Sequence, residues 1–160
     1  MTLAFRNIDV TPADPVSKWH SEGIQAALER GDITHWRRIA AEVQQDPFGQ
    51  VAQELSEVLT YSRPYGIADV MADVLSHARS AARDGERAEV AAEVRSLINN
   101  SGLTNQAFAA RIGTSPSRLS SYATGRVVPS AAMMVRMRRL LDRAVNEVSD
   151  GSNQGQLRRT

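Results

Sequence analysis

The stretch that decides the fold lies at residues 102–130 and reads GLTNQAFAARIGTSPSRLSSYATGRVVPS. Thr104 is placed to cap a short helix, and Gly113 is placed to supply the left-handed turn that ends it. Ser115 as N-cap, with Pro116 at the first helical position, begins a second short helix. The segment therefore predicts two short helices joined by a tight turn.

The second of these helices, which ends at Gly125, has two different faces. At about 100° per residue, Leu119 and Tyr122 share one face, which we expect to lie in the core. Arg118 lies on the flank, and the opposite face carries only short hydroxyl side chains, namely Ser117, Ser120, Ser121 and Thr124. Two helices of about two turns, separated by three residues that include a glycine, predict a helix-turn-helix. A face of hydroxyls can approach a DNA groove closely and exchange hydrogen bonds with base edges.

This part of the sequence resembles the lambdoid-repressor-like, or XRE, family of helix-turn-helix regulators. The resemblance is ungapped, covers about residues 88–145 and rests on Gly102-Leu103-Thr104, Phe108-Ala109, Ile112-Gly113, Leu119, Tyr122, Gly125-Arg126 and Pro129-Ser130. It implies a five-helix C-terminal domain that places Pro116–Thr124 in the major groove of DNA. By the same resemblance, Ser117 and Ser121 match groove-facing positions.

The candidate DNA-binding residues lie on this helix and near its ends. Arg118 and Arg126, with Asn105 at the N-terminus of the first motif helix, are placed to contact phosphates. The full set is Asn105, Gln106, Ser115, Ser117, Arg118, Ser120, Ser121, Thr124 and Arg126. The alternative interpretation is that the serines are only a solvated surface.

The sequence departs from the family pattern in two places. Family members often pair an Arg in the first helix with a Glu near the end of the recognition helix, but Ile98 and Ala123 stand at these positions. We expect an apolar contact there, with no charge stranded. Pro116 and Ser121 stand where relatives commonly hold Gln, Arg or Lys. Because bidentate base readers are absent, we expect weak direct readout, with specificity from water, DNA shape or dimer spacing.

Charge is divided unevenly along the chain, although its net value is only +1. Residues 1–84 carry eight basic and twelve acidic side chains, whereas residues 85–160 carry eleven basic and six acidic ones. No Asp or Glu occurs from Val94 to Leu141, a stretch that holds seven arginines. A GC-rich genome explains the preference for Arg over Lys, but not the missing acids. A cationic segment of this length indicates a surface that binds a polyanion.

The N-terminal half shows helical periodicity and no sustained alternation of period two, so the predicted fold class is all-α. Asp14 as N-cap and Pro15 at the first helical position predict a helix that runs to about Arg30. Asp32 or Thr34 is placed to cap the next helix. Three more apolar stripes complete a bundle of about four short helices, at residues 36–43, 51–59 and 67–78.

These patterns predict four regions. An irregular N-terminus covers residues 1–13, and a helical dimerisation or partner domain covers residues 14–84. Asp84-Gly85 is the expected joint, although a helix could continue through it at a cost of about 1 kcal/mol for the glycine. The DNA-binding domain follows at residues 86–148. Residues 149–160 have almost nothing apolar to bury, so we expect a disordered tail.

The composition excludes several classes of protein. The chain has 160 residues and no cysteine, which excludes a disulfide framework, a thiolate zinc site and a cysteine nucleophile. The start of the sequence has no signal-peptide pattern, and no apolar run is long enough to span a bilayer, so we expect a cytoplasmic protein. His20, His35 and His77 lack metal-ligand spacing, and no nucleophile or phosphate-loop motif occurs. We therefore expect no enzymatic activity, no cofactor and no metal.

Three functions remain open on these observations. The first is a DNA-binding regulator, a repressor, that binds double-stranded DNA as a homodimer while the N-terminal bundle dimerises or senses a signal. The second is an antitoxin, whose acidic half binds a toxin and whose basic half autoregulates the operon. The third is a protein-interaction module with a degenerate helix-turn-helix. We expect dimerisation through the N-terminal bundle, and the competing interpretation places it on the helix after Pro129, through Met133, Met137 and Leu140.

Overall fold

The computed structural model describes residues 3–6 and 9–154, with side chains described as far as Asn146. Within these residues all regular structure is helical and no strand occurs, so the expected all-α class is confirmed. The chain divides into two compact units, Met1–Arg83 and Asp84–Thr160. In the described part of the chain, no helix combines the length and the apolar character needed to cross a membrane.

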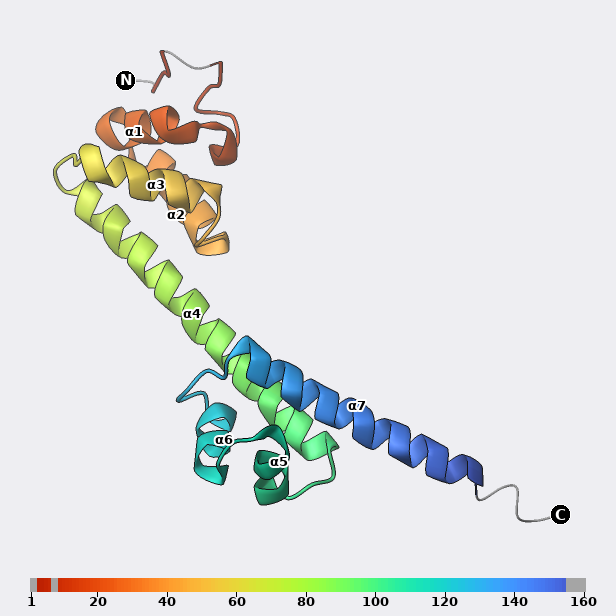
Figure 1. Cartoon of the computed structure of the whole chain (residues 1–160). Helices are drawn as coiled ribbons and strands as arrows, with labels where there is room; N and C mark the ends of the chain where they lie inside the picture. Colours follow the sequence, from red (N-terminus) through yellow and green to blue (C-terminus); the bar gives the residue numbers. More distant parts are fainter. Residues whose placement is uncertain (1–2, 7–8, 155–160) are drawn as a thin grey trace. The chain divides into compact units, whose positions relative to one another are not determined.

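The N-terminal unit is a small helical bundle (Figure 1). It contains the 3-10 helix η1 (Val16–Lys18) and the helices α1 (His20–Arg30), α2 (Ile33–Gln45) and α3 (Gln50–Tyr61), together with the first part of α4 (Ile67–Asn100). The predicted apolar stripes supply one continuous core, in which the largest fully buried side chains include Trp19, Ile24, Ile39, Leu55 and Met71.

The expected helix from Asp14 to the end of α1 is wrong in its first part. Pro15 precedes the short η1, and α1 begins only at His20, whose φ is +53°. The Asp14 carboxylate accepts hydrogen bonds from the Thr11 amide at 2.7 Å and the Thr11 hydroxyl at 2.8 Å, so it stabilises the preceding turn instead of capping the helix. The backbone hydrogen bond from Thr11 is also the main reason that the pKa of Asp14 is lowered.

Tertiary contacts of Trp19 accompany this break. The Trp19 side chain is fully buried, and its indole N–H donates to the Asp14 carbonyl at 3.0 Å. The Arg38 guanidinium lies 4.8 Å from the centre of the Trp19 ring and donates to the carbonyls of Pro12 and Asp14. The first regular helix therefore begins directly after a tryptophan whose ring and indole N–H are held by contacts with residues outside α1.

Asp32, rather than Thr34, is the N-cap of α2. Its carboxylate accepts from the amides of Thr34 at 2.9 Å and His35 at 3.4 Å. The hydrogen bond from the Thr34 amide is the largest cause of a lowered Asp32 pKa. The cap satisfies amides that the first turn of a helix leaves without a partner.

Helix α4 is one helix of 34 residues, and it continues through Asp84-Gly85, where the sequence predicts a joint. Its first turns contribute Met71 and Leu75 to the N-terminal core, and its last turns contribute Val94 and Leu97 to the C-terminal core. Residues 83–89 between these parts are all exposed. One glycine costs a helix about 1 kcal/mol, which does not end a helix that packed turns support on both sides.

The C-terminal unit contains the last part of α4 with α5 (Asn105–Ile112), α6 (Pro116–Ala123) and α7 (Ala131–Gln154). In Figure 1, α7 lies alongside the last part of α4 and α5 lies beside α6. The described part of this unit therefore has four helical segments, where the family resemblance implies five. No glycine or proline interrupts residues 131–150, so the chain after Ser130 forms one helix.

Most of the methionine stripe on α7 belongs to the core. Met134 and Met137 are buried, and Met133 and Leu140 are half-buried against the same cluster. The expected disordered tail is wrong for residues 149–154, because α7 continues to Gln154. A helix that is already formed gains one hydrogen bond with each added residue, which the composition alone does not reveal. The rest of that tail, residues 155–160, lies outside the described residues.

Candidate nucleic-acid interface

Local hydrogen bonds define both ends of α5. The Thr104 hydroxyl oxygen accepts from the Ala107 amide at 3.2 Å. At the other end Gly113 has φ +78° and ψ +41°, and its amide donates to the Ala110 carbonyl at 3.2 Å. This left-handed conformation is unfavourable for a residue with a Cβ atom. The predicted cap and the predicted glycine turn are both confirmed.

The start and the end of α6 also follow the sequence signals. The Ser115 hydroxyl oxygen accepts from the Arg118 amide at 3.2 Å, and Pro116 occupies the first helical position. The helix is followed by Gly125, whose φ is +74°. A Cβ atom on Gly125 would lie 3.5 Å from the Cβ atom of Ala91, so the chain after α6 runs close to α4.

The orientation of α6 is set by two side chains that enter the core. Leu119 and Tyr122 are buried in the cluster that contains Phe108. The Tyr122 hydroxyl accepts a hydrogen bond from Nε of Arg118 at 2.9 Å, which satisfies the polar end of a buried ring. The core face predicted from the sequence is therefore confirmed.

The other face of α6 is the predicted hydroxyl face. Ser117, Ser120 and Thr124 are exposed, and Ser121 is half-buried. The Ser121 hydroxyl donates to the Ser117 carbonyl at 3.2 Å, and the Thr124 hydroxyl donates to the Ser120 carbonyl at 2.9 Å. Because these two hydroxyl hydrogens are used within the helix, the oxygens of Ser121 and Thr124 remain as acceptors.

Three arginines lie at the start and the end of α6. Arg118 is exposed in the first turn, and its bond to Tyr122 uses only Nε, which leaves its terminal nitrogens for other acceptors. Arg126 follows the helix, with its Nε 3.4 Å from the Thr124 hydroxyl oxygen. Arg95 of α4 donates from a terminal nitrogen to the Ala123 carbonyl at 2.6 Å. Guanidinium groups in these places can bind the phosphates on either side of a groove.

One arginine of the acid-free stretch has a carboxylate partner. Arg138 on α7 donates from Nε to Glu93 at 2.7 Å and from a terminal nitrogen at 3.1 Å to the other oxygen of the same carboxylate. The hydrogen bond from Arg138 is the main cause of a lowered Glu93 pKa. The sequence places Glu93 just before the acid-free stretch, so the cationic surface is smaller than its seven arginines suggest.

Residues 89–150 match the family model of a helix-turn-helix domain. Residues 89–150 form a helix-turn-helix domain. The match confirms the resemblance to helix-turn-helix regulators and covers less than half of the chain. No curated protein and no solved structure matches the chain. Domains of this class bind DNA by placing the second helix of the motif in the major groove, and α6 is the second helix of the motif in this chain.

Apolar packing replaces the family ion pair in this helix-turn-helix domain. Ile98 is buried and Ala123 is half-buried against the same cluster. Arg95, one turn before Ile98 on α4, donates to the Ala123 carbonyl. An arginine therefore still reaches the end of α6, and it contacts the backbone instead of a glutamate.

The structure brings most of the predicted site residues together on α6 and at its ends. Asn105 and Gln106 belong to the other helix of the motif, and they are exposed in the first turn of α5. Two arginines near the motif are absent from the set predicted from the sequence. Arg95 is one of them, although its position one turn before Ile98 is a usable signal. Arg136 is the other, and a terminal nitrogen of its side chain lies 3.8 Å from where a Cβ atom on Gly113 would lie, at the motif turn.

Proposed function

We propose that the chain is a cytoplasmic, non-catalytic DNA-binding regulator that represses transcription by binding a two-fold symmetric operator as a homodimer. Pro116–Thr124 enters the major groove of each half-site. The observation that carries this proposal is the exposed hydroxyl face of α6, with Arg118 and Arg126 beside it and no acidic residue from Val94 to Leu141. The phosphates that border a DNA groove attract a surface with arginines and no acidic residue more strongly than a surface of mixed charge.

The side chains divide into two roles. Arg118, Arg126, Ser115, Asn105 and Gln106 contact the phosphate backbone, which positions the domain without reading sequence. The bases are contacted by hydroxyl groups, those of Ser117, Ser120, Ser121 and Thr124. Oxygens that remain as acceptors suit the exocyclic amino groups of adenine and cytosine in the major groove. Each such contact is single, so DNA shape and half-site spacing supply the rest of the specificity.

A random-oligonucleotide selection with the purified full-length chain tests the proposal. We expect an enriched two-fold symmetric site whose half-sites lie about one helical turn apart. Ser117→Ala and Ser121→Ala should each change the base preference at one position of each half-site, and leave nonspecific affinity nearly unchanged. Ser96→Ala, at an exposed serine of α4, is the matched control and should recover the original site. If both variants recover the original site, the proposal that these serines contact bases is contradicted.

A second candidate function is the antitoxin of a toxin–antitoxin pair. It is favoured by the excess of acidic residues in the N-terminal half, which suits a cationic protein partner. A small toxin that co-purifies with the chain, encoded by an adjacent gene, would support it. Failure to enrich any sequence in the selection contradicts the regulator and supports a protein-interaction module instead.

A further inference from the structure

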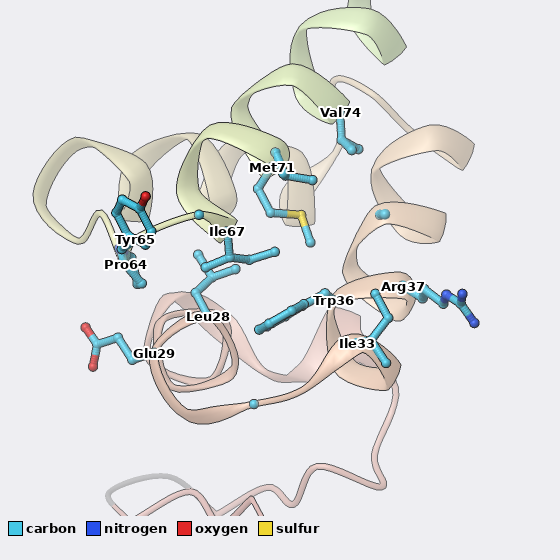
Figure 2. A pocket seen from close by; sticks show the side chains of 14 residues that line it. Leu28, Glu29, Ile33, Trp36, Arg37, Pro64, Tyr65, Ile67, Met71 and Val74 are labelled. Carbon is cyan, nitrogen blue, oxygen red and sulfur yellow. The ribbon is translucent and has the colours of Figure 1, made fainter.

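The N-terminal unit has an apolar groove of ≈ 700 Å³ between the end of α1, α2 and the start of α4. Figure 2 shows its lining side chains. Leu28, Ile67 and Met71 form its floor and are buried, and the half-buried Trp36 stands beside them. The volume is in the range of sites that bind small ligands, so the occupant must be decided by the chemistry of the lining.

Two polar groups of the groove, the Trp36 indole N–H and the Glu29 carboxylate, already have partners within the chain. The Trp36 indole N–H donates to the Ala27 carbonyl at 2.9 Å. The Glu29 carboxylate accepts from the Gln25 amide at 2.8 Å and from the Ser62 hydroxyl at 2.7 Å, and these bonds lower the Glu29 pKa, Gln25 having the larger effect. A specific polar ligand needs convergent polar groups to orient it, and the floor of this groove offers none.

The rim of the groove is unusually apolar for an exposed surface. The fractional exposure is 56% for Ile33, 54% for Val70 and 106% for Tyr65. A small molecule would fill the floor and leave these three side chains in water. A protein surface would cover the floor and the rim together, which is the usual meaning of clustered exposed apolar side chains.

The charges at the two ends of the groove are complementary to those of a second copy of the same chain. Glu29 and Arg37 lie at opposite ends of the groove in Figure 2, and Tyr65 stands on its rim. A two-fold axis through the middle of the groove exchanges its ends, which brings each Glu29 toward Arg37 of the other copy. The same rotation carries the exposed Tyr65 of each copy onto the apolar surface of the other.

We infer that this groove is the homodimer interface, in which two copies dock face to face and bury Tyr65, Val70 and Ile33. The inference rests on the proposed function, because a two-fold symmetric operator calls for a two-fold symmetric dimer. It assigns the dimer to the N-terminal unit and not to the stripe on α7, where Met134 and Met137 are already buried within one chain.

The first experiment follows the full-length chain without DNA. Sedimentation equilibrium over a concentration series should show a reversible monomer–dimer equilibrium. Acrylamide quenching of tryptophan fluorescence should decrease as the dimer forms, because Trp36 lies in the groove whereas Trp19 is fully buried in both states. A monomer at every concentration overturns the inference. A dimer with unchanged Trp36 quenching also overturns it, because the contact then lies elsewhere.

Substitutions on the rim locate the interface. Tyr65→Ala and Val70→Asp should each raise the dimer dissociation constant at least about tenfold, because apolar anchors dominate such interfaces. Both side chains are exposed in one chain, so the circular dichroism of the monomer should not change. Tyr61→Ala is the matched control, since Tyr61 is an exposed tyrosine of the same unit outside the groove. Equal effects of Tyr61→Ala and Tyr65→Ala contradict the assignment.

A charge substitution tests the two-fold arrangement. Arg37→Glu should weaken the dimer at low salt, because it places like charges at both ends of the interface, and the effect should shrink as salt screens them. No effect at low salt contradicts the pairing of ends. If the chain stays monomeric but binds a different protein, and Tyr65→Ala weakens that binding, the occupant of the groove is that protein and not a second copy.

The inference and the proposed function can fail separately. Dimerisation through the groove with no enriched DNA site leaves the interface standing and removes the regulator. A symmetric site bound by a dimer that Tyr65→Ala does not weaken leaves the regulator standing and removes the groove.

Discussion

The two units are built from similar amphipathic helices, but they differ in the side chains that they leave in contact with solvent: every exposed aromatic side chain of the described residues lies in the N-terminal unit. The N-terminal unit exposes large apolar side chains such as Ile33, Tyr65 and Val70 in a half that is rich in acids. The C-terminal unit exposes the hydroxyl face of α6 and arginines such as Arg118. Burial of apolar surface stabilises both units, whereas the uncovered surface selects the class of partner. Core patterns therefore predict the fold of each unit and say little about what the unit binds.

The largest expected effect is a loss of stability that is confined to the C-terminal unit. Phe108→Ala truncates the largest fully buried side chain of the C-terminal unit and should lower the free energy of unfolding by about 3–5 kcal/mol. Helicity and DNA binding should fall, while the emission of Trp19 and Trp36 stays native, because both lie in the N-terminal unit. Urea denaturation followed by circular dichroism and by fluorescence makes the comparison. Val135→Ala, at an exposed site on α7, should leave both transitions unchanged.

If native tryptophan emission is lost at the same urea concentration as C-terminal helicity, the expected difference in stability between the two units is contradicted. That result would mean that Phe108→Ala unfolds both units in one cooperative step.

The second prediction separates the units by their response to salt. The affinity for duplex DNA should fall as salt rises, with a logarithmic slope of about −0.9 for each phosphate contact. Arg118→Gln and Arg126→Gln should each reduce that slope by about one per half-site. Arg30→Gln, at an exposed arginine of α1, is the matched control and should leave the slope unchanged. Fluorescence anisotropy at several salt concentrations measures it, and a salt-independent affinity would falsify the cationic interface.

The third prediction compares two glycines within the C-terminal unit. Gly125 has φ +74°, so Gly125→Ala should lower the free energy of unfolding by about 1–2 kcal/mol. Gly85 lies in helical α4, and a Cβ atom there would meet nothing within 4 Å. Gly85→Ala should therefore raise the free energy of unfolding by about 0.5–1 kcal/mol. Urea denaturation of both variants measures these opposite signs, and equal signs would contradict the backbone argument.

The smallest expected effect is a difference between the two units in the pH at which acid unfolds them. Hydrogen bonds lower the pKa of Asp14, Glu29 and Asp32 in the N-terminal unit, and Glu93 is the one carboxyl with a lowered pKa that the described C-terminal residues contain. A carboxyl with a lowered pKa stabilises the fold above its unfolded pKa of about 4, and this stabilisation is lost as pH falls through the folded pKa.

On acidification we therefore expect the tryptophan emission of the N-terminal unit to change at a higher pH than the helicity of the C-terminal unit. Glu29→Gln should reduce the pH dependence of the fluorescence transition. All four carboxyl groups are largely solvated, so the difference between the two transition pH values should be small. Transitions at the same pH in fluorescence and in circular dichroism would contradict this prediction.

The helix-turn-helix could be predicted from the sequence because its signals are local. Thr104, Gly113 and Ser115 act on amides or carbonyls within four residues, and the spacing of Leu119 and Tyr122 fixes the buried face. The hydroxyl face follows from the same spacing. Its role in reading bases stays a prediction.

The remaining features depend on contacts between distant residues. The helix break at His20 accompanies packing of Arg38 on Trp19, and Arg95 reaches a carbonyl 28 residues along the chain. The groove forms between the end of α1, α2 and the start of α4. The apolar periodicity of one helix assigns Trp36 to a buried stripe, but it cannot show that one side of the Trp36 side chain is left uncovered. Helical periodicity also cannot tell whether Gly85 ends a helix, because the answer depends on the packed turns that flank it.

The continuous helix α4 is not equally stable along its length. Residues 83–89 are exposed and helical, and neither core buries them, so their hydrogen bonds persist only by propagation from the turns around Met71 and Val94. Amide hydrogens in such a segment exchange with solvent through local opening, without waiting for either unit to unfold. The slowest exchange in α4 should therefore occur near its two packed ends, and the fastest exchange inside it should occur around Gly85. A helix without a visible break can still have a point at which it opens first.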